Sequence, residues 1–538
     1  MRKIIFTIIV LFSLGAKAQD SIETNINPKL VIGLVVDQMR YDYLYRYWDK
    51  LSEGGFKKML SSGYSFKNAN FSYLPTYTAP GHATIYAGTT PAVHGISANT
   101  WYDKDFKVMR YCVDDRRFKS VGTQTEEGDK SPSNLTVTTI GDEMKLMNNN
   151  HSKVISIALK DRSAILPGGH KANAAYWIDK QGKWITSSYY MQQLPSWVVD
   201  MNIKRSGKFY LGKDWEPMFP IMEYEESFSD NNDYEETHIW EDAPVFPHDF
   251  SKITANEGFD IVKYTPMGNT MTIDFAQKAI VKEKLGQDKY TDLLAVSFSP
   301  IDYIGHFYGP HSVEMEDAII QLDAELESFF KFVKKNVGND VLFFLTADHG
   351  AVNVPRYLTD QKIPSGYFDG DACGSILNAY FKNTYEVEKI VENYYNAQLQ
   401  LDENTIKEHG LNADFVKEKV IQIIKGFAGV QDVLVIKDLK KGTSSAMEEK
   451  AINGYYYSRS GDYFIILKPG WIHDQKKGTT HGSGYSYDTH VPLIFMGTGI
   501  THGSSNQMVN IRDIAPTIST LINISFPNGT TGNPLRFE

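Results

Sequence analysis

Three short apolar runs, each followed closely by an aspartate, constrain the fold of this chain more than any other feature. The runs are LVIGLVV before Asp37, LLAVSFS before Asp302 and VLFFLTA before Asp348. They lack polar alternation, which predicts strands buried on both faces of a parallel sheet. Helical patterns lie between such runs, the clearest over residues 313–336, with acids early and lysines late. This alternation predicts a doubly wound α/β fold, with a mostly parallel central sheet and helices on both faces.

The acids at the strand ends occur together with three histidines. Ligands of such sheets bind beyond the carboxyl ends of the strands, where the aspartates lie. Asp302 and His306 are four residues apart and would share one face of a helix. His349 directly follows Asp348, and His481 stands in the glycine-rich loop GTTHGSG. Each of these motifs alone would also be explained by a turn or a helix cap. Taken together, however, they provide nitrogen and oxygen ligands that suit zinc.

The six residues divide into two predicted metal sites. Each site has three protein ligands and an open position, as catalytic zinc requires. Two metals about 4 Å apart would act on the nucleophile and the leaving oxygen of an in-line displacement at phosphorus. The predicted sites are Asp302, His306 and His481 in one and Asp37, Asp348 and His349 in the other.

The stretch LPTYTAPGHATIYAG, residues 74–88, supplies the predicted nucleophile. Thr78 stands two residues before Pro80, which is tolerated only in the first turn of a helix. Thr78 is therefore the expected N-cap, where the helix field favours negative charge on its oxygen. Helix capping alone would also explain this residue. Beside an open metal position, however, the same placement favours an alkoxide, so Thr78 is both the predicted nucleophile and a metal ligand.

The quoted motifs resemble the alkaline phosphatase superfamily, and within it the PafA-type phosphate monoesterases. The similarity covers nearly all of the chain after its first residues. It lies in VVDQMRYDYL, YTAPGHATIYAGTTPAVHGI, LKDRSAI, DYIGHFYGP, TADHGA, HGSGYSYDTHVPLIF and IRDIAPTI. The resemblance implies an alkaline phosphatase with two Zn²⁺ per chain, which hydrolyses small phosphate monoesters through a phosphothreonine intermediate.

The resemblance also implies a phosphoryl-binding set of Asn99, Lys160 and Arg162. A monoester dianion has one more anionic oxygen to stabilise than a diester, which a lysine and an arginine would provide. If SIALKDR is a strand, alternation places Lys160 and Arg162 on the same face. Without the resemblance, these residues would be a solvated strand end, and Asn99 an ordinary turn residue.

Four other functions are weighed against this one. A phosphodiesterase or phosphonate hydrolase would need Lys160 and Arg162 to point away, with residues 165–275 forming a leaving-group pocket. A sulfatase would need a C/S-x-P-x-R motif, which Thr78-Ala-Pro-Gly-His82 lacks. A mutase of the phosphoglycerate type fits poorly with export. A metal- or phosphate-binding protein without turnover would tolerate loss of Thr78.

The first eighteen residues have the features of a signal peptide. Two basic residues precede an apolar stretch of about eleven residues, too short to span a bilayer, and Ala16-Lys17-Ala18 fits a cleavage site. We therefore expect an exported protein, periplasmic or secreted, that begins near Gln19 and has no membrane span. Cleavage would take the net charge from −10 to −13, which argues against a nucleic-acid-binding face.

The remaining predictions concern organisation. We expect one domain over residues 19–538, with insertions at about 165–275 and 380–470, the second beginning with helical spacing over residues 385–398. Cap-like insertions that cover the core favour a monomer. Cys112 and Cys373 could pair or remain as two buried thiols. A structural role is expected for His82 and His94, which have no obvious partner at metal spacing, and support of the site for His490, which comes just before a strand. Trp101 and Tyr102 are expected at the pocket.

Overall fold

The computed structural model describes residues 26–253, 256–439, 442–473 and 475–538. The predicted signal peptide, residues 1–18, lies outside these ranges. No helix within them combines the length and the apolar character that crossing a bilayer requires.

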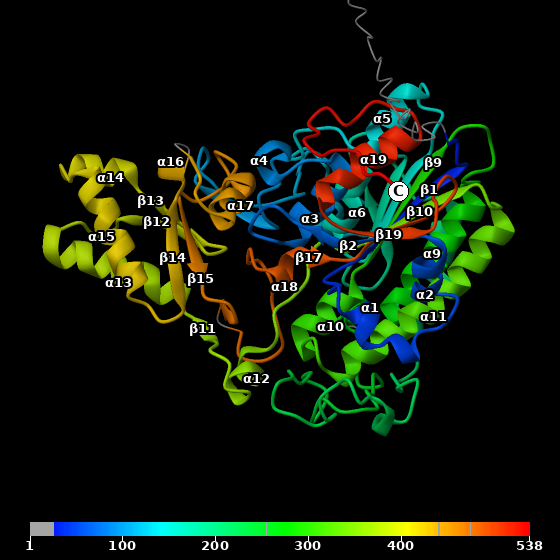
Figure 1. The fold of residues 1–538 in the computed structure, drawn as a ribbon, viewed down its shortest axis with the longest axis horizontal. Helices are drawn as coiled ribbons and strands as arrows, with labels where there is room; N and C mark the ends of the chain where they lie inside the picture. Colours follow the sequence, from blue (N-terminus) through cyan, green and yellow to red (C-terminus); the bar gives the residue numbers. More distant parts are fainter. Residues whose placement is uncertain (1–25, 254–255, 440–441, 474) are drawn as a thin grey trace, which may run out of the picture.

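The central layer is a mixed sheet of eleven strands with a parallel middle (Figure 1). β1 (Leu30–Val36) lies between β10 (Val341–Thr346) and β9 (Asp292–Phe298), and both neighbours run parallel to it. β6 (Val154–Ala158) and β7 (Ala174–Ile178) continue the parallel part beyond β9. These five strands include the three apolar runs, so the predicted α/β fold is confirmed.

Mostly antiparallel strands close both edges of the sheet. They are β5 (Ser120–Val121) and β8 (Trp184–Ser187) beyond β7, and β18 (Leu493–Gly497), β2 (Tyr64–Asn70), β17 (His490–Val491) and β19 (Gly503–Asn510) beyond β10. Because β18 runs antiparallel to β10, with Leu493 opposite Thr346, the loop before β18 lies at the carboxyl end of β10. This topology brings the His481 loop to the edge of the sheet where the aspartates lie.

Helices cover both faces of the sheet (Figure 1). On one face lie α3 (Thr78–Ala87), α5 (Ile140–Met147), α6 (Asp161–Gly168) and α19 (Ile514–Leu521), and on the other α2 (Phe56–Ser62), α9 (Met267–Lys282) and α11 (Val313–Asn336). α11 has the bounds that the sequence pattern predicted. The Ser312 hydroxyl caps it by accepting a hydrogen bond from the Met315 amide.

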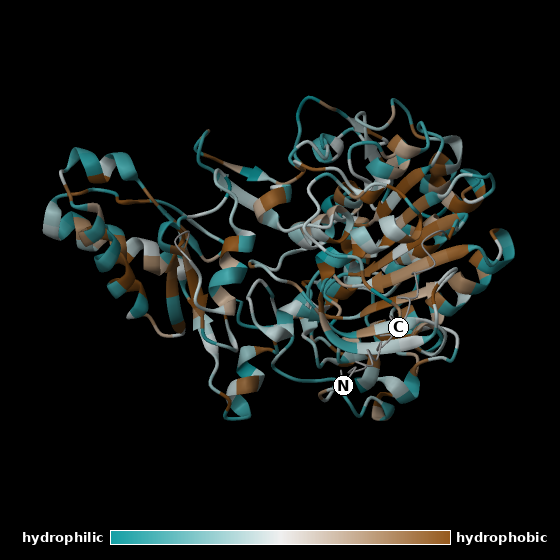
Figure 2. Cartoon of the chain, turned by 45° about the horizontal axis from the view of Figure 1, so that its top comes forward, coloured by the Kyte–Doolittle hydropathy of each residue, from teal (hydrophilic) through white to brown (hydrophobic). Residues whose placement is uncertain are grey.

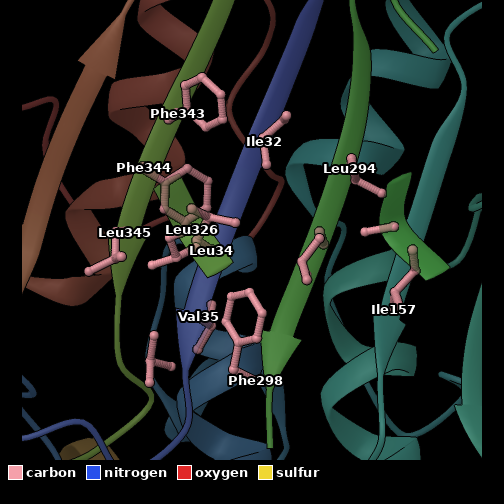
Figure 3. Close-up of a cluster of buried hydrophobic side chains, with 14 of the residues drawn as sticks. Ile32, Leu34, Val35, Ile157, Leu294, Phe298, Leu326, Phe343, Phe344 and Leu345 are labelled. Carbon is pink, nitrogen blue, oxygen red and sulfur yellow. The ribbon is translucent and has the colours of Figure 1, made fainter. Parts of the chain in front are cut away.

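The core lies between the parallel strands and these helices (Figure 3). Ile32 of β1, Phe298 of β9, Phe344 of β10 and Leu326 of α11 are all fully buried there. Figure 2 shows the same strands as the most hydrophobic part of the molecule. Burial on both faces explains why these strands carry no polar alternation.

The predicted insertion at 165–275 is only in part an addition to the core, because β7 and β8 belong to the central sheet. The part that follows contains α7 (Ser196–Lys204), α8 (Gly207–Tyr210) and connecting loops. These loops pack on the first turns of α11. Trp215 Nε1 and Tyr224 Oη donate hydrogen bonds to the two carboxylate oxygens of Asp317, at 2.7 and 2.6 Å.

His248 adds a charged connection between the same loops and α11. Its Nδ1 lies 2.9 Å from Glu241 Oε1 and its Nε2 lies 3.2 Å from Glu314 Oε1, with all three residues buried or nearly so. Burial opposes a charge on the ring, but the hydrogen bonds to Glu241 and Glu314 outweigh it and raise the pKa of His248 to about 9.

We expect His248 to stabilise the fold below neutral pH and to lose this contribution at alkaline pH. A raised folded-state pKa gives stability that is fully present below the unfolded value of about 6.5 and is lost as pH rises through about 9. The difference between these two pKa values corresponds to a contribution of about 3 kcal/mol to the free energy of unfolding. The measurement is the free energy of unfolding from pH 6 to 10 for the native chain and for His248→Gln.

The exposed His502 provides a matched control as His502→Gln. The pH dependence of other groups, including the metal ligands, is common to these proteins and cancels in the difference. A stability gap between the native chain and His248→Gln that stays constant across this pH range would contradict the prediction.

The second insertion forms a lobe with its own core, seen at the left of Figure 1. Its antiparallel sheet has the order β12 (Val391–Tyr395), β13 (Gln398–Leu401), β15 (Tyr463–Leu467) and β14 (Val430–Val435). Its helices are α13 (Gly370–Tyr385), α14 (Glu403–Glu408), α15 (Ala413–Lys425), α16 (Ile436–Leu439) and α17 (Ala446–Gly454). Two short parallel strands, β11 (Gly366–Phe368) and β16 (Trp471–His473), lie where the chain enters and leaves the lobe.

The helical spacing over residues 385–398 was a wrong prediction. α13 ends at Tyr385, and β12 follows within the segment. β-branched and aromatic residues favour a strand there, and Asn396 and Ala397 turn the chain with φ of 55° and 57°. The two cysteines are free and buried, Cys112 packing beside the central sheet and Cys373 in the core of the lobe.

Candidate active site

Two groups of aspartate and histidine side chains lie at the carboxyl ends of β1, β9 and β10. Within each group the possible ligand atoms all lie within 4.8 Å of one another. The groups are Asp302, His306 and His481, and Asp37, Asp348 and His349. The structure thus brings together all six residues in the two predicted sets. The rings of His349 and His481 stack with centroids 3.5 Å apart, so the groups are adjacent.

The first group is built on α10 (Pro300–Tyr308), which places His306 one turn after Asp302. The Nε2 atoms of His306 and His481 lie 3.2 and 3.6 Å from Asp302 Oδ1. Their Nδ1 atoms meet the carbonyl oxygens of Thr479 and Thr76, at 2.8 and 2.7 Å. Because a carbonyl only accepts, each Nδ1 carries the proton, which leaves both Nε2 lone pairs free for a metal.

The second group contains buried polar atoms without hydrogen-bond partners among the described residues. These atoms are Asp37 Oδ1, Asp348 Oδ2 and His349 Nε2. His349 Nε2 lies 3.6 Å from each of the two oxygens, and its Nδ1 bonds to the Gly350 carbonyl. Buried polar atoms are rarely left without a partner. Two carboxylate oxygens and an imidazole nitrogen that converge in this way fit a bound cation.

Electrostatics at Asp37 support the same interpretation. Burial and the nearby Asp348 carboxylate raise the pKa of Asp37 well above its usual value, although Lys160 opposes the shift. The charges of the group are therefore only partly compensated by the protein itself. A divalent cation would complete the compensation, and the nitrogen and oxygen ligands of both groups suit zinc.

Lys160 and Gln38 connect the two groups. The Lys160 ammonium lies 2.7 Å from Asp37 Oδ2 and also forms an ion pair with Asp302. Gln38 donates from its side-chain amide to Asp302 Oδ1 at 2.7 Å and from its backbone amide to Asp348 Oδ1 at 3.1 Å. A side chain on Gly305 would lie 1.9 Å from Gln38 Oε1, so the glycine of DYIGH makes room for this connection.

Thr78 is the first residue of α3 and is 1% exposed. The N-cap is Tyr77 rather than Thr78, which corrects the predicted position by one residue. The Tyr77 side chain makes no capping hydrogen bond to the helix backbone. Asn99 instead accepts a hydrogen bond from the Ala79 amide through Oδ1, at 2.8 Å. Asn99 is thereby fixed beside Thr78, with its Nδ2 as the atom that can donate to a ligand.

Arg162 does not follow the predicted strand alternation. β6 ends at Ala158, Lys160 is the N-cap of α6, and Arg162 lies in the first turn of that helix. Its Nη1 donates to Tyr111 Oη at 3.1 Å, while its Nε is buried without a partner among the described residues. Tyr111 belongs to β4 (Val108–Tyr111), which pairs with β3 (Thr100–Asp103) directly after Asn99. One hairpin therefore positions both Asn99 and Arg162.

Sequence reasoning missed the contacts that two residues make with the candidate ligands. One is Gln38, which follows Asp37 directly. The other is His82, whose Nδ1 lies 3.2 Å from Asp348 Oδ2 and 2.9 Å from the Thr78 carbonyl, while Nε2 meets Ser297 Oγ at 2.8 Å. Its spacing of four residues after Thr78 is the signal that was available in the sequence.

His94 and His490 make ordinary structural contacts. Burial lowers the pKa of His94 to about 3, and its neutral ring bonds to Thr84 and to the Ile96 amide. His490 stacks on Tyr41 at 4.3 Å. Trp101 and Tyr102 border a small cavity together with Lys104 and Arg459.

This fold, with its paired groups at the strand ends, is that of the alkaline phosphatase superfamily. The family model for type I phosphodiesterase / nucleotide pyrophosphatase matches residues 31–492. The chain therefore belongs to this family, and its close relatives include named alkaline phosphatases. It is 43% identical to alkaline phosphatase PhoV of Synechococcus elongatus over 96% of this chain and 94% of the relative.

Two further relatives are as similar. Alkaline phosphatase PafA of Elizabethkingia meningoseptica is 41% identical over 98% of this chain and 97% of the relative. A protein of Myroides odoratus named calcium-transporting ATPase is 43% identical over 98% and 96%. A crystal structure of PafA superposes with a TM-score of 0.91, at 41% identity, over 95% of this chain and 98% of PafA. A PafA variant, also solved, has one threonine changed to serine and an asparagine, a lysine and an arginine changed to alanine.

Proposed function

We propose that this protein is an exported, zinc-dependent alkaline phosphatase that hydrolyses phosphate monoesters to inorganic phosphate through a phosphothreonine intermediate. The observation that carries the proposal is the position of Lys160, which contacts an acid of each group next to Thr78. A lysine there can bind the additional charged oxygen of a monoester. The relatives named alkaline phosphatases support the same activity, and the sequence of residues 1–18 supports export. We further propose a monomer without a nucleic-acid-binding face.

The reaction proposed is a double displacement. Thr78 Oγ1 attacks phosphorus in line, so that an Oγ1–P bond forms as the P–O bond to the alcohol breaks. Water then attacks the phosphothreonine, which restores the threonine and releases phosphate with net retention at phosphorus. Zinc ions held by the two groups would supply positive charge that favours ionised oxygen nucleophiles and stabilises the leaving oxygen. Asp302, His306 and His481 would hold one ion, and Asp37, Asp348, His349 and Thr78 the other.

Three side chains would bind the transferred phosphoryl group. Asn99 is oriented by the Ala79 amide and presents its Nδ2. Lys160 supplies a compact charge between the two groups. Arg162 lies beside Tyr111 and offers its Nε, which has no partner within the part of the chain that the structure describes. The residue types changed together in the PafA variant, threonine, asparagine, lysine and arginine, are the four proposed here. Preorganised donors of this kind are a large source of phosphoryl-transfer catalysis.

The test is kcat/KM for an aryl phosphate monoester and the matching diester, measured on zinc-loaded native protein and on Lys160→Ala. We expect the native enzyme to prefer the monoester strongly. Lys160→Ala is expected to lower monoester turnover by about two to three orders of magnitude, the scale for losing one transition-state donor. The diester has one anionic oxygen fewer and should lose much less.

The matched control is Lys171→Ala, which removes an exposed lysine eleven residues further along the chain. If Lys160→Ala lowered kcat/KM equally for the monoester and the diester, the dianion-binding role of Lys160 would be rejected. Such a result would indicate damage to the positions of Asp37 and Asp302. A preference of the native enzyme for the diester would instead favour a phosphodiesterase or phosphonate hydrolase with the same nucleophile. Absence of turnover for every phosphate ester would favour a binding protein.

A further inference from the structure

We infer that a cavity of about 70 Å³ beside His481 binds the leaving alcohol and selects uncharged, apolar alcohols, aromatic ones above all. The inference rests on the proposed function, and it names the class of phosphate monoester that this enzyme hydrolyses best. The cavity lies between the active site and the second insertion. It is lined from the active-site side by Tyr77, Thr480 and His481, and from the lobe by residues of β15, β16 and α17.

The inner end of the cavity meets the reacting centre. Tyr77 directly precedes the proposed nucleophile, and its ring packs edge-on against His481 with centroids 5.4 Å apart. Gly482, at φ 122°, has no side chain, and a Cβ there would lie 2.8 Å from the Tyr77 ring. His481 belongs to the group that faces the leaving oxygen in an in-line attack by Thr78. The alcohol therefore departs into this cavity.

The outer wall is apolar and is provided by the lobe. Phe464 and Ile466 of β15 are 1% and 7% exposed, and Met447 of α17 lies over Gly484. The turn at Asn396 and Ala397 connects this wall to the active site. Asn396, next to the left-handed Ala397, donates its side-chain amide to the Thr100 carbonyl at 2.8 Å, one residue after Asn99. The lobe thus has a defined position relative to the phosphoryl group.

Away from the zinc ion that His481 would hold at its inner end, the described lining of the cavity provides no cationic side chain. Among the described residues that line it there is neither lysine nor arginine, and the carboxylate is that of Asp488. The imidazole of His473 is neutral, since burial lowers its pKa to about 4. Lys450 is not among the lining residues, and its ammonium donates to the Gly484 carbonyl at 2.6 Å. A second anionic group on the substrate would lose its hydration without gaining a partner here, whereas an aromatic ring would gain apolar contacts.

The experiment places a charge in the wall at Met447, a half-buried position that can accept a polar side chain. The substrates are phenyl phosphate, 4-carboxyphenyl phosphate and methyl phosphate, whose methyl group is too small to reach the wall. We expect the native enzyme to prefer phenyl over 4-carboxyphenyl phosphate by about tenfold. Met447→Lys should narrow this ratio by about five- to tenfold, and Met447→Glu should widen it by a similar factor.

Met447→Gln is the matched control, because it changes polarity without adding charge and should leave the ratio near the native value. A binding measurement by calorimetry accompanies the kinetics, with phenylphosphonate and methylphosphonate as probes. The native, zinc-loaded protein should bind phenylphosphonate more tightly, and Phe464→Ala should remove most of that difference.

The outcomes separate the inference from the proposed function. If all three esters are hydrolysed but neither charged variant moves the ratio, the cavity does not hold the alcohol and the inference is overturned alone. If no ester is hydrolysed by the zinc-loaded protein, the proposed function fails as well. If the charged variants change methyl phosphate turnover as strongly as phenyl phosphate turnover, the charge acts on the phosphoryl group, which also overturns the inference.

Discussion

Replacing Thr78 with alanine is expected to lower kcat/KM for an aryl phosphate by at least about four orders of magnitude, the scale for removing a covalent nucleophile. The change removes one hydroxyl from the start of α3, where Thr78 is 1% exposed and lies next to the amide bonded by Asn99. A threonine hydroxyl is a weak nucleophile unless its environment favours the ionised oxygen. The helix N-terminus favours negative charge there, and the zinc ions that the two Asp/His groups would hold add positive charge beside it.

Two variants separate loss of chemistry from loss of structure. Thr78→Ser keeps the hydroxyl and should retain most of the activity. Thr84→Ala removes a buried hydroxyl of the same helix, one bonded to His94, and should lower stability more than turnover. Acid quenching during turnover should trap phosphate on Thr78 in the native chain. Normal turnover by Thr78→Ala, or a label on another residue, would reject the assigned nucleophile.

The candidate metal ligands were predictable because the topology of a parallel sheet places all strand ends at one edge. Asp37 and Asp348 come just after β1 and β10, so a parallel arrangement places both at the same edge of the sheet, and the pairing of β1 with β10 brings them close. Asp302 and His306 needed only a helix after β9 to share a face. The residue patterns thus contained the grouping before the order of the strands was known.

The connections between the groups were not predictable from local pattern. Gln38 bonds to residues 264 and 310 positions away, and such pairings depend on the path of the whole chain. His82 has the same property, since its partner Asp348 comes from β10. A local rule failed at Arg162 because the strand ends at Ala158 and a helix begins at Asp161, so alternation no longer applies. A leaving-group pocket was expected from residues 165–275 for a diesterase, whereas the cavity that we infer to hold the leaving alcohol is lined by the lobe of the second insertion.

Removal of bound metal is expected to abolish turnover and to lower the thermal stability of the protein. Asp37 Oδ1, Asp348 Oδ2 and His349 Nε2 are buried and have no hydrogen-bond partner among the described residues. Without a cation, charges of like sign are left close together in the interior, where their mutual repulsion is poorly screened. A ligand bound only by the folded state adds stability by mass action, about 4 kcal/mol at a thousand times Kd. Dialysis against a chelator should therefore lower both Tm and activity.

Restoration of the metal provides the decisive measurement, because the donor set predicts which ion succeeds. Zn²⁺ should restore Tm and activity together, with two ions bound per chain by elemental analysis, whereas Mg²⁺ and Ca²⁺ prefer all-oxygen ligands and should restore neither. Asp348→Asn keeps the shape of the site and removes one charge, so it should bind fewer ions and respond less to chelation. His490→Gln alters a histidine that stacks on Tyr41 and belongs to neither group, and this variant should bind as many ions as the native chain. A chelated protein with unchanged Tm and full activity would show that the two Asp/His groups hold no ion on which the chemistry depends.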